Sequence, residues 1–348
     1  MDARLRKGLK KMHRKAFTLV ELLVVISIIA MLLGILMPSL NKAKKSAQAV
    51  TCGANKKGLG LGMLAYTAEF YYFPASYLYP SNDKGGYSIE HQDPAHPYGY
   101  LHWSWYLFNS GKCKAEAFSC PSMTRGGAPR TNPGSKQEDW ENNQLDQNGQ
   151  GQPNNLTDKQ APRISVTANA AIIPRNKFTP DLSGGQRVNR FVRADEIRNP
   201  SSLILATEFN SNWTAIGVQQ GGGFLSKSHR PVLAFSHIGT GYIGNAVYEP
   251  PLNTPGYVYG DSSARLYGIR PLVEVENNSD LLDGGCGHPI NAVGRHHAGP
   301  GQTKEYGGCA NFVYCDGHVA RKTILETMQK REWGNKFYSI TGSNEVLK

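Results

Sequence analysis

Residues 17–37 read FTLVELLVVISIIAMLLGILM, and Glu21 is the one charged side chain in this run of 21 residues. A helix of this length rises about 31 Å, the thickness of the hydrocarbon core of a bilayer. The run is longer than the apolar region of an ordinary cleaved secretory signal, and no small-residue cleavage pattern follows it. The chain has no second run of this length and a mean hydropathy of −0.43. The sequence therefore predicts one membrane-spanning helix and excludes a polytopic membrane protein.

Basic residues are concentrated in front of this helix. Seven of the 38 Lys and Arg residues, but one of the 27 Asp and Glu residues, fall in positions 1–16, so this leader holds more than half of the formal net charge of +11. Because positively charged flanks stay in the cytoplasm, residues 1–16 are predicted to be cytoplasmic and residues 38–348 to be exported. The basic surplus is then a topology signal and does not indicate nucleic-acid binding.

Glu21 is out of place in an apolar span, because a carboxylate inside a bilayer costs a few kcal/mol or more without a partner. The span holds no other ionisable group, so the partner has to come from another chain or from a newly made N-terminal amine. A positively charged amine at such a new N-terminus of one subunit and Glu21 of a neighbour would attract each other strongly in lipid. Such a pairing would set the register of helices packed side by side.

Residues 15–38, KAFTLVELLVVISIIAMLLGILMP, resemble the N-terminal signal of type IV pilins and type II secretion pseudopilins. In that family a prepilin peptidase cuts before the phenylalanine and N-methylates it. The resemblance implies that the cut falls between Ala16 and Phe17. It also implies that Glu21 is the assembly glutamate and that Pro38 is the helix-kinking proline at the end of the span. Ala16 departs from the glycine that the family prefers, but alanine is small enough to fit.

The helix is expected to continue beyond the membrane, over residues 38–72. Apolar residues recur there at three- and four-residue spacing, and lysines stand among them. This pattern predicts an apolar stripe turned toward the rest of the protein and a lysine face turned toward water. The stripe consists of Leu40, Ala43, Ala47, Val50 and Ala54, and the lysines are Lys42, Lys44 and Lys45.

Residues 73–348 are expected to form a globular domain with an antiparallel sheet, which makes the fold class α+β, as in pilins. The chain is 40% hydrophobic and 19% charged, which excludes a disordered tail, a collagen-like chain and a small disulfide-rich toxin. Short apolar runs bounded by turn residues predict the strands. The candidate strands are Trp103–Phe108, Ser202–Thr207, Val232–Phe235 and Asn311–Cys315. A polar tract at about residues 124–162 predicts a long exposed insertion.

Asp316-Gly317 separates two β-prone runs and predicts a hairpin with a type I′ turn. This region also carries a second resemblance. GRHHAG and CANFVYCDGHV are similar to the C-terminal signature of prepilin-type processing-associated H-x9-DG proteins, with His296 and His297 before Asp316 and Gly317. Eighteen residues separate His297 from Asp316, so about nine extra residues lie between the two halves of the motif.

Other segments match the same family more loosely. Cys52 through Gly60 resembles its Cys-x-x-N-x-K-x-x-G segment, Cys120-Pro121 its mid-chain Cys-Pro, and Asn199-Pro200-Ser201 its turn before an apolar strand. The resemblance is therefore scattered over the whole chain. The biochemical role of that family is unassigned.

Three further groups of residues contain side chains that could carry chemistry. An even number of cysteines, six, in an exported domain is compatible with disulfides, and Cys113 and Cys120 are close enough in sequence to close a small loop. A metal site or a Cys–His nucleophile is conceivable in the C-terminal part, but a hairpin with incidental polar residues is the favoured interpretation. The side chains concerned are His296, His297, Cys315, Asp316 and His318.

Oxygen-rich loops around Asp261, Asp280 and Asp283 are the third group, because calcium uses such ligands. Major pseudopilins carry a calcium loop near the C-terminus, so the resemblance adds weight to calcium. The spacing is not that of an EF-hand, and a plain polar loop is the favoured interpretation.

We therefore expect a structural subunit, not an enzyme, that prepilin peptidase processes and that assembles with other pilin or pseudopilin subunits. It would lie in the bacterial inner membrane before assembly, in contact with lipid, with its C-terminal domain periplasmic or extracellular. No nucleic-acid partner and no cofactor other than calcium is expected. Two alternatives stay open. One is an envelope binding protein that uses the signal for export and anchoring, which the polar insertion favours, and the other is a tethered enzyme that uses the C-terminal His, Cys and Asp side chains.

Overall fold

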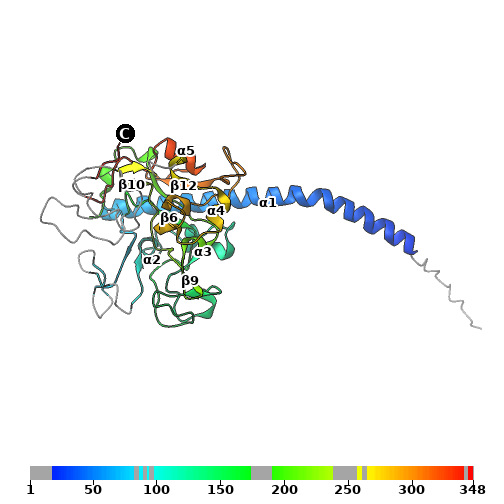
Figure 1. Cartoon of the computed structure of the whole chain (residues 1–348), viewed down its shortest axis with the longest axis horizontal. Coiled ribbons are helices and arrows are strands. Elements are labelled where there is room, and N and C mark those ends of the chain that lie inside the picture. The colour runs from blue at the N-terminus through cyan, green and yellow to red at the C-terminus, as the bar shows by residue number, and fades with distance from the viewer. Residues whose placement is uncertain are drawn as a thin grey trace, which may run out of the picture. The chain divides into compact units, whose positions relative to one another are not determined.

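The computed structural model describes residues 18–81, 86–88, 92–93, 98–173, 190–237, 257–260, 265–340 and 344–347. Over these residues the protein has the expected α+β class, with a long N-terminal helix followed by a globular part built on antiparallel sheets (Figure 1). The chain divides into two compact units, residues 1–45 and 46–348. The boundary falls inside the long helix, so the second half of that helix belongs to the globular unit.

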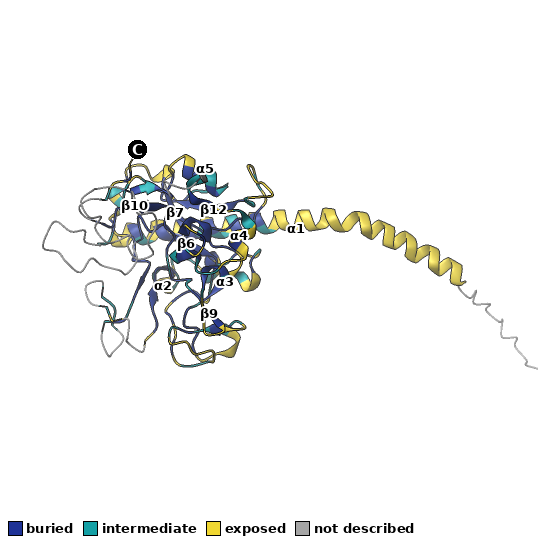
Figure 2. Ribbon diagram, in the orientation of Figure 1, coloured by how far each residue is buried: buried dark blue, intermediate teal, exposed yellow. Residues whose placement is uncertain are grey.

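The long helix, α1 (Leu19–Phe70), continues through Pro38. Every large apolar side chain over residues 19–40 is exposed, from 45% for Val25 to 77% for Leu19 (Figure 2). A helix that is apolar all round is stable only inside lipid or among other apolar helices. This segment is therefore long enough and apolar enough to cross a membrane.

The second half of α1 is buried along one face, but not along the face that the sequence predicted. The expected stripe of Leu40, Ala43, Ala47, Val50 and Ala54 is exposed throughout, as are Lys42, Lys44 and Lys45. The buried face carries Ala49, Cys52, Lys56, Leu59, Gly60, Met63 and Thr67. The prediction of the stripe is wrong because this face includes a thiol and an ammonium group, which only partners from the globular part make compatible with burial.

Four antiparallel strands form the main sheet, in the order β13 (Val319–Lys322), β12 (Ala310–Tyr314), β7 (Ile204–Glu208) and β6 (Val166–Ala168). The two central strands, β12 and β7, are buried at every position. Val313 and Asn311 of β12 face α1, where they meet Gly60 and Gly53. Because side chains alternate along a strand, Phe312 lies on the opposite face, against Trp333. Figure 1 shows the globular half of α1 running beside β12.

Smaller elements surround this sheet. Further strand pairs and a three-stranded sheet are β1 (Tyr77–Leu78) with β2 (Leu101–His102), β3 (Ala128–Pro129) with β5 (Arg163–Ile164), β10 (Phe235–His237) with β11 (Tyr257–Tyr259), and β9 (Gly223–Leu225) between β4 (Gln144–Leu145) and β8 (Val218–Gln220). The short α-helices are α2 (Trp103–Asn109), α3 (Trp213–Ile216), α4 (Leu272–Glu276) and α5 (Ile324–Gln329). The 3-10 helices are η1 (Ala115–Phe118), η2 (Thr124–Gly126), η3 (Gln137–Asp139), η4 (Ala194–Glu196), η5 (Pro200–Ser202), η6 (Arg265–Gly268), η7 (Leu281–Asp283) and η8 (Pro289–Ala292).

Two of the four predicted strands are confirmed, as β7 and β12. Trp103–Phe108 is instead helix α2, because His102 caps its first turn by accepting a hydrogen bond from the Ser104 backbone N–H. Val232–Phe235 is also wrong as a strand. Phe235 alone belongs to β10, while Val232 makes an isolated parallel bridge with Asn169 at the end of β6.

The hairpin at Asp316-Gly317 is confirmed, with Val313 of β12 opposite Val319 of β13. Its turn differs from the predicted type I′. Gly317 has a positive φ of 80°, whereas Asp316 does not, and Tyr314 donates its backbone N–H to the carbonyl of His318 at 2.9 Å. This is the pattern of a three-residue loop that ends on a left-handed glycine.

The polar tract at residues 124–162 is exposed at many positions, as its composition predicted, but it also has a buried, hydrogen-bonded part. Asp158 is fully buried and accepts hydrogen bonds from the backbone N–H groups of Tyr100 and Asn132 and from the Asn132 side chain, at 2.6–2.9 Å. Asp146 is also buried and organises a turn by accepting from the backbone of Asn148 and Gln150. Polar side chains here satisfy backbone donors internally, which allows burial without apolar residues.

Candidate functional site

Four buried side chains from distant parts of the sequence meet beside α1. Cys52 lies on α1, Cys120 on the loop after η1, Glu208 at the end of β7, and His297 on the segment that leads to β12. Each offers a sulfur, nitrogen or oxygen atom, and these four atoms all lie within 4.8 Å of one another. We refer to Cys52, Cys120, Glu208 and His297 as the buried cluster.

Distances within the buried cluster are those of direct contact. The Nε2 atom of His297 lies 3.1 Å from Oε2 and 3.3 Å from Oε1 of Glu208, and 3.7 Å from Sγ of Cys120. The Sγ atom of Cys52 lies 2.5 Å from Oε1 of Glu208. His296 adds a second imidazole, whose Nε2 is 3.7 Å from Sγ of Cys120. The Glu208 and Cys120 side chains therefore both converge on one imidazole nitrogen.

Electrostatics favour the charged forms of Glu208, Cys120 and His297, whereas the hydrogen bond with Cys120 and burial raise the pKa of the Cys52 thiol. Burial would raise the pKa of Glu208, but the hydrogen bond from His297 and the positive charge of Lys56 outweigh it and hold that pKa below its ordinary value. Hydrogen bonds from Cys52, His296 and His297 likewise lower the pKa of Cys120. Burial alone would lower the pKa of His297, but its contacts with Cys120 and Glu208 raise it to about 9.

Lys56 supplies a fully buried ammonium group next to the buried cluster. Its Nζ donates to Oγ of Ser165 at 2.7 Å and to the carbonyl of Ser119 at 2.9 Å. Asn55 donates to the same Ser119 carbonyl at 3.3 Å. Two consecutive residues of α1 therefore hold the residue before Cys120, which fixes the Cys120 side chain against the helix.

Backbone pairing positions His297. Its N–H donates to the carbonyl of Cys309 at 3.1 Å, and the N–H of Cys309 donates back at 2.7 Å. The residues between them form a loop closed at its base, in which Thr303 and Gly307 also pair. The extra residues of the H-x9-DG-like motif are therefore looped out, and His297 stays next to β12.

The Asp316-Gly317 turn docks on α1 separately from the buried cluster. Lys57 donates to the Gly317 carbonyl at 2.9 Å, and a Cβ at Gly60 would lie 3.0 Å from the Cα and O atoms of Gly317. Asp316 accepts from the backbone and ring of His318 at 3.0 and 2.6 Å. His297 and Asp316 thus have different partners, and the structure does not join them in one His–Asp interaction.

The remaining sequence candidates are not gathered into one site. All six cysteines are free thiols, so the disulfide that Cys113 and Cys120 could have formed is absent, because Cys120 turns inward toward the imidazoles. Cys315 is buried in the hairpin, where burial raises its thiol pKa. Among the calcium candidates, Asp283 forms an ion pair with Arg230, Asp280 precedes η7, and Asp261 lies outside the described residues. Calcium at these residues stays a prediction.

Glu208 and Lys56 are the site residues that sequence reasoning missed. Glu208 ends the otherwise uncharged strand Ile204–Glu208, and Lys56 stands on the same helix face as Cys52. A charged residue at the end of a run expected to be buried is the signal that could have indicated Glu208.

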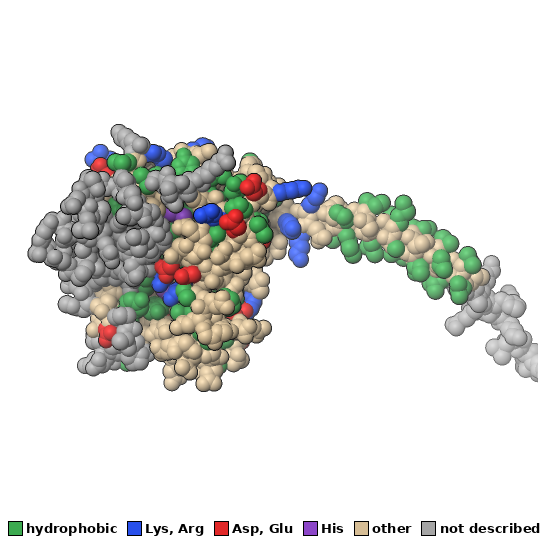
Figure 3. Space-filling model, in the orientation of Figure 1, with side chains coloured by type: hydrophobic (Ala, Val, Ile, Leu, Met, Phe, Trp, Pro, Cys, Tyr) green, Lys and Arg blue, Asp and Glu red, His purple; other side chains and the backbone are tan. Residues whose placement is uncertain are grey.

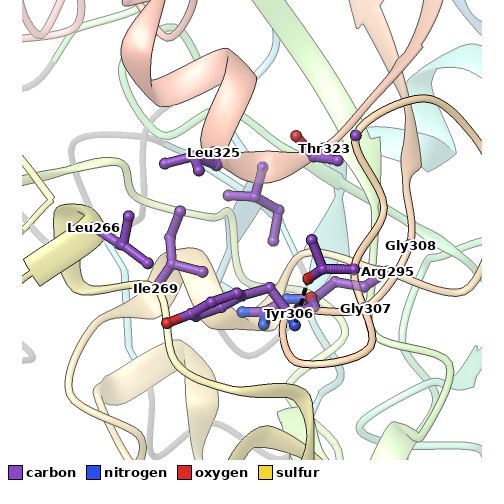
Figure 4. Close-up of a pocket in the computed structure, with 11 residues that line it drawn as sticks. Leu266, Ile269, Arg295, Tyr306, Gly307, Gly308, Thr323 and Leu325 are labelled. Atoms are coloured by element: carbon purple, nitrogen blue, oxygen red, sulfur yellow. Dashed lines mark hydrogen bonds between the residues drawn. The ribbon is translucent and has the colours of Figure 1, made fainter.

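A separate cavity of about 60 Å³ lies between η6, α5 and the loop that follows His297. Figure 4 shows Leu266, Ile269, Tyr306 and Leu325 around it, with Arg295 donating to the Tyr306 carbonyl at 3.4 Å. This volume holds only a few water molecules. It is a packing defect at the edge of the core and is too small for a substrate.

At the other end of the chain, Thr18 and Glu21 form a capping box at the start of α1. The Glu21 carboxylate accepts from the backbone N–H and the hydroxyl of Thr18, both at 2.8 Å, and the Glu21 N–H donates back to the hydroxyl at 3.2 Å. Hydrophobic side chains cover the visible face of the helix that follows (Figure 3). Ala16 and Phe17 lie outside the described residues.

Comparison with known proteins gives one match. Residues 11–37 match the family model described as Prokaryotic N-terminal methylation motif. No curated protein and no solved structure matches the chain. The chain thus carries a prepilin-type methylation motif that overlaps the start of a helix apolar enough to span a membrane, and this combination fits membrane anchoring.

Proposed function

We propose that the protein is a pilin-like subunit, cut by prepilin peptidase between Ala16 and Phe17, that assembles through α1 into a type IV pilus-like or type II secretion pseudopilus fibre. The observation that carries the proposal is the methylation motif at residues 11–37, which from Leu19 onward lies on an exposed apolar stretch of α1 whose one acidic side chain is Glu21. Such a surface requires lipid before assembly and neighbouring helices afterwards.

Glu21 has a definite place in this proposal. The capping box holds its carboxylate at the first turn of α1, and cleavage would create a positively charged amine at Phe17, next to the N-cap residue Thr18. The amine of one subunit and the carboxylate of a neighbour would then neutralise each other in a medium of low dielectric constant. Because a fixed carboxylate loses little freedom on pairing, the capping box favours this contact.

The proposed location is the inner membrane, with residues 1–16 in the cytoplasm and the globular part periplasmic or extracellular. The basic leader supports this orientation. Lys42, Lys44 and Lys45 are exposed where α1 leaves the apolar segment, and lysines in that position are attracted to anionic lipid headgroups. A structural and not an enzymatic role is supported by the burial of the Cys and His side chains of the buried cluster, which a substrate cannot reach.

Kinship with the H-x9-DG family is part of the proposal. Residues from its scattered signature contact one another here: Cys52, Cys120 and His297 in the buried cluster, and Lys57, Gly60 and Gly317 at the docked turn. Residues that maintain one fold are expected to contact one another even when they are far apart in the sequence. This convergence supports the resemblance.

Mass spectrometry of the membrane-extracted protein tests the processing step. The expected N-terminus is N-methylated Phe17. An intact Met1 in cells that contain active prepilin peptidase would refute processing and, with it, the fibre proposal.

Replacing Glu21 tests assembly. Glu21→Ala is expected to remain membrane-inserted and processed but to be absent from sheared or cross-linked fibres. Glu138→Ala is the matched control, since Glu138 is exposed on the globular part, and it should assemble normally. Normal incorporation of Glu21→Ala would defeat the pairing.

The envelope-binding alternative makes a different prediction for the same samples. Its supporting observation is the folded polar tract at residues 124–162, a large element that anchoring alone does not require. In that case Phe17 is methylated, yet cross-linking of the native membrane finds no contacts between neighbouring copies of α1.

A further inference from the structure

We propose that Cys52, Cys120, Glu208 and His297 form a structural binding site for one zinc-type divalent cation. Two sulfurs, one imidazole nitrogen and one carboxylate oxygen are a donor set that zinc accepts. All four residues are buried, and their donor atoms lie within 4.8 Å of one another. This inference concerns the folded exported part and does not depend on assembly into a fibre.

The spacing of the donor atoms is close to that of a tetrahedral site. With Zn–S at about 2.3 Å and Zn–N or Zn–O at about 2.0–2.2 Å, neighbouring ligand atoms lie about 3.3–3.8 Å apart. The Nε2 atom of His297 is 3.7 Å from Sγ of Cys120 and 3.3 Å from Oε1 of Glu208. The Sγ atom of Cys52, at 2.5 Å from Oε1 of Glu208, has to move away by about 1 Å to reach this spacing.

Asn311 orients the carboxylate for this role. Its backbone N–H and its side-chain amide donate to Oε2 of Glu208, at 2.8 and 3.1 Å. Oε1 is thereby left facing Cys52, while Nε2 of His297 lies 3.3 Å from Oε1 and 3.1 Å from Oε2. Hydrogen bonds of this kind to the atom that does not ligate the ion are the usual support of metal ligands.

Charge balance also favours a divalent ion. Two thiolates and the Glu208 carboxylate carry three negative charges, while the cation and the buried Lys56 ammonium carry three positive charges. The loaded site is therefore neutral and needs no counter-ion from solvent, which burial would exclude. Because four protein ligands fill a tetrahedral shell and no side chain is exposed, the site is structural and not catalytic.

The ion would join α1 to the sheet. Its ligands come from α1, from the loop after η1, from β7 and from the segment before β12, so one ion would close loops over most of the globular unit. A Cys52–Cys120 disulfide uses only the two sulfurs and gives no role to the convergence of Glu208 and His297. We therefore favour the cation, and the disulfide is an outcome of the test.

The test uses full-length protein extracted from membranes in detergent without reductant. Zinc is measured by mass spectrometry, and thiols are counted after denaturation in chelator. The expected result is one zinc per chain and six titratable thiols. Four thiols without zinc would identify the disulfide, and six thiols without zinc, even after incubation with Zn²⁺ or Co²⁺, would identify a metal-free hydrogen-bonded network. Either result overturns the proposal.

Cobalt substitution tests the ligands in the wild-type fold. Co²⁺ is expected to give thiolate charge-transfer absorption that added Zn²⁺ abolishes. Asn311→Ala should weaken binding about 10- to 100-fold while circular dichroism stays unchanged, because the change removes one orienting hydrogen bond and no ligand. Cys120→Ser removes one of the two thiolate ligands and should lose at least about half of the absorption. Cys113→Ser, which alters a half-buried cysteine outside the buried cluster, should keep all of it. Equal absorption in the two serine variants would overturn the assignment.

Discussion

Gly58 and Gly60 offer a direct measurement of how closely the C-terminal hairpin packs on α1. Both lie inside the helix, so alanine at either position gains about 1 kcal/mol of helix propensity. A Cβ at Gly58 meets nothing within 4 Å, whereas a Cβ at Gly60 lies 3.0 Å from the Cα and O atoms of Gly317 and from Cγ1 of Val313. Overpacking of this kind costs about 1–3 kcal/mol.

Both alanine variants have the same gain in helix propensity, so the difference in stability between them reports only the overpacking at Gly60. Gly60→Ala should therefore be less stable than Gly58→Ala by about 1–3 kcal/mol. Gly58→Ala itself should be about 1 kcal/mol more stable than the unaltered protein. Urea unfolding of the full-length protein in one detergent, followed by tryptophan fluorescence, measures both differences. Equal stability of the two alanine variants would refute the close approach of Gly317 to α1.

Further predictions concern the buried face of α1 and the hairpin. Lys56→Met should cost about 1–3 kcal/mol of unfolding free energy, because it leaves the buried Ser119 carbonyl and Ser165 hydroxyl without their ammonium donor. Lys57→Met, which removes one part-buried hydrogen bond to Gly317, should cost about 1 kcal/mol. Leu59→Ala should cost about 2–5 kcal/mol, since Leu59 is 1% exposed, while Leu61→Ala, at 53% exposure, should stay within about 0.5 kcal/mol. Burial would raise the pKa of the Asp316 carboxyl, but hydrogen bonds from His318 hold that pKa below its ordinary value. The ionised Asp316 carboxylate therefore stabilises the fold above about pH 4, and this stabilisation is lost as the pH falls through the lower native pKa. The stability difference between the unaltered protein and Asp316→Asn should therefore shrink between pH 7 and pH 3, and a constant difference in urea unfolding would contradict this assignment.

The elements that the sequence predicted correctly are those whose signal lies within one short stretch of the chain. The apolar run at residues 17–37 predicted the exposed half of α1, because length and polarity alone decide whether a helix suits a bilayer. Asp316-Gly317 predicted the hairpin between β12 and β13, since the left-handed residue of a short loop has to be one that tolerates positive φ. The strand predicted at Trp103–Phe108 is a helix, because the hydrogen bond by which His102 caps its first turn does not enter β propensity.

The buried cluster is the part of the molecule that sequence reasoning could not predict. Cys52 and Cys120 were noticed as parts of a resemblance, and His297 as part of a motif, but nothing in the order of residues brings them to Glu208. Their meeting depends on the pairing of β7 with β12 and on the hydrogen bonds from Asn55 and Lys56 to the Ser119 carbonyl. These are contacts between residues far apart in the chain, which periodicity does not encode.

By itself, then, the sequence determined the prepilin-type signal, the single apolar span, the α+β class and the C-terminal hairpin. The signal, the span and the hairpin each depend on composition or spacing within one short stretch, and the α+β class depends on a long apolar run followed by short runs bounded by turn residues. Only the tertiary structure decided which face of α1 is buried, because the apolar stripe at Leu40–Ala54 is exposed while Cys52 and Lys56 are enclosed. A thiol and an ammonium group can be buried only where carboxylate, imidazole and carbonyl partners arrive from other elements, and the fold alone brings those partners to them.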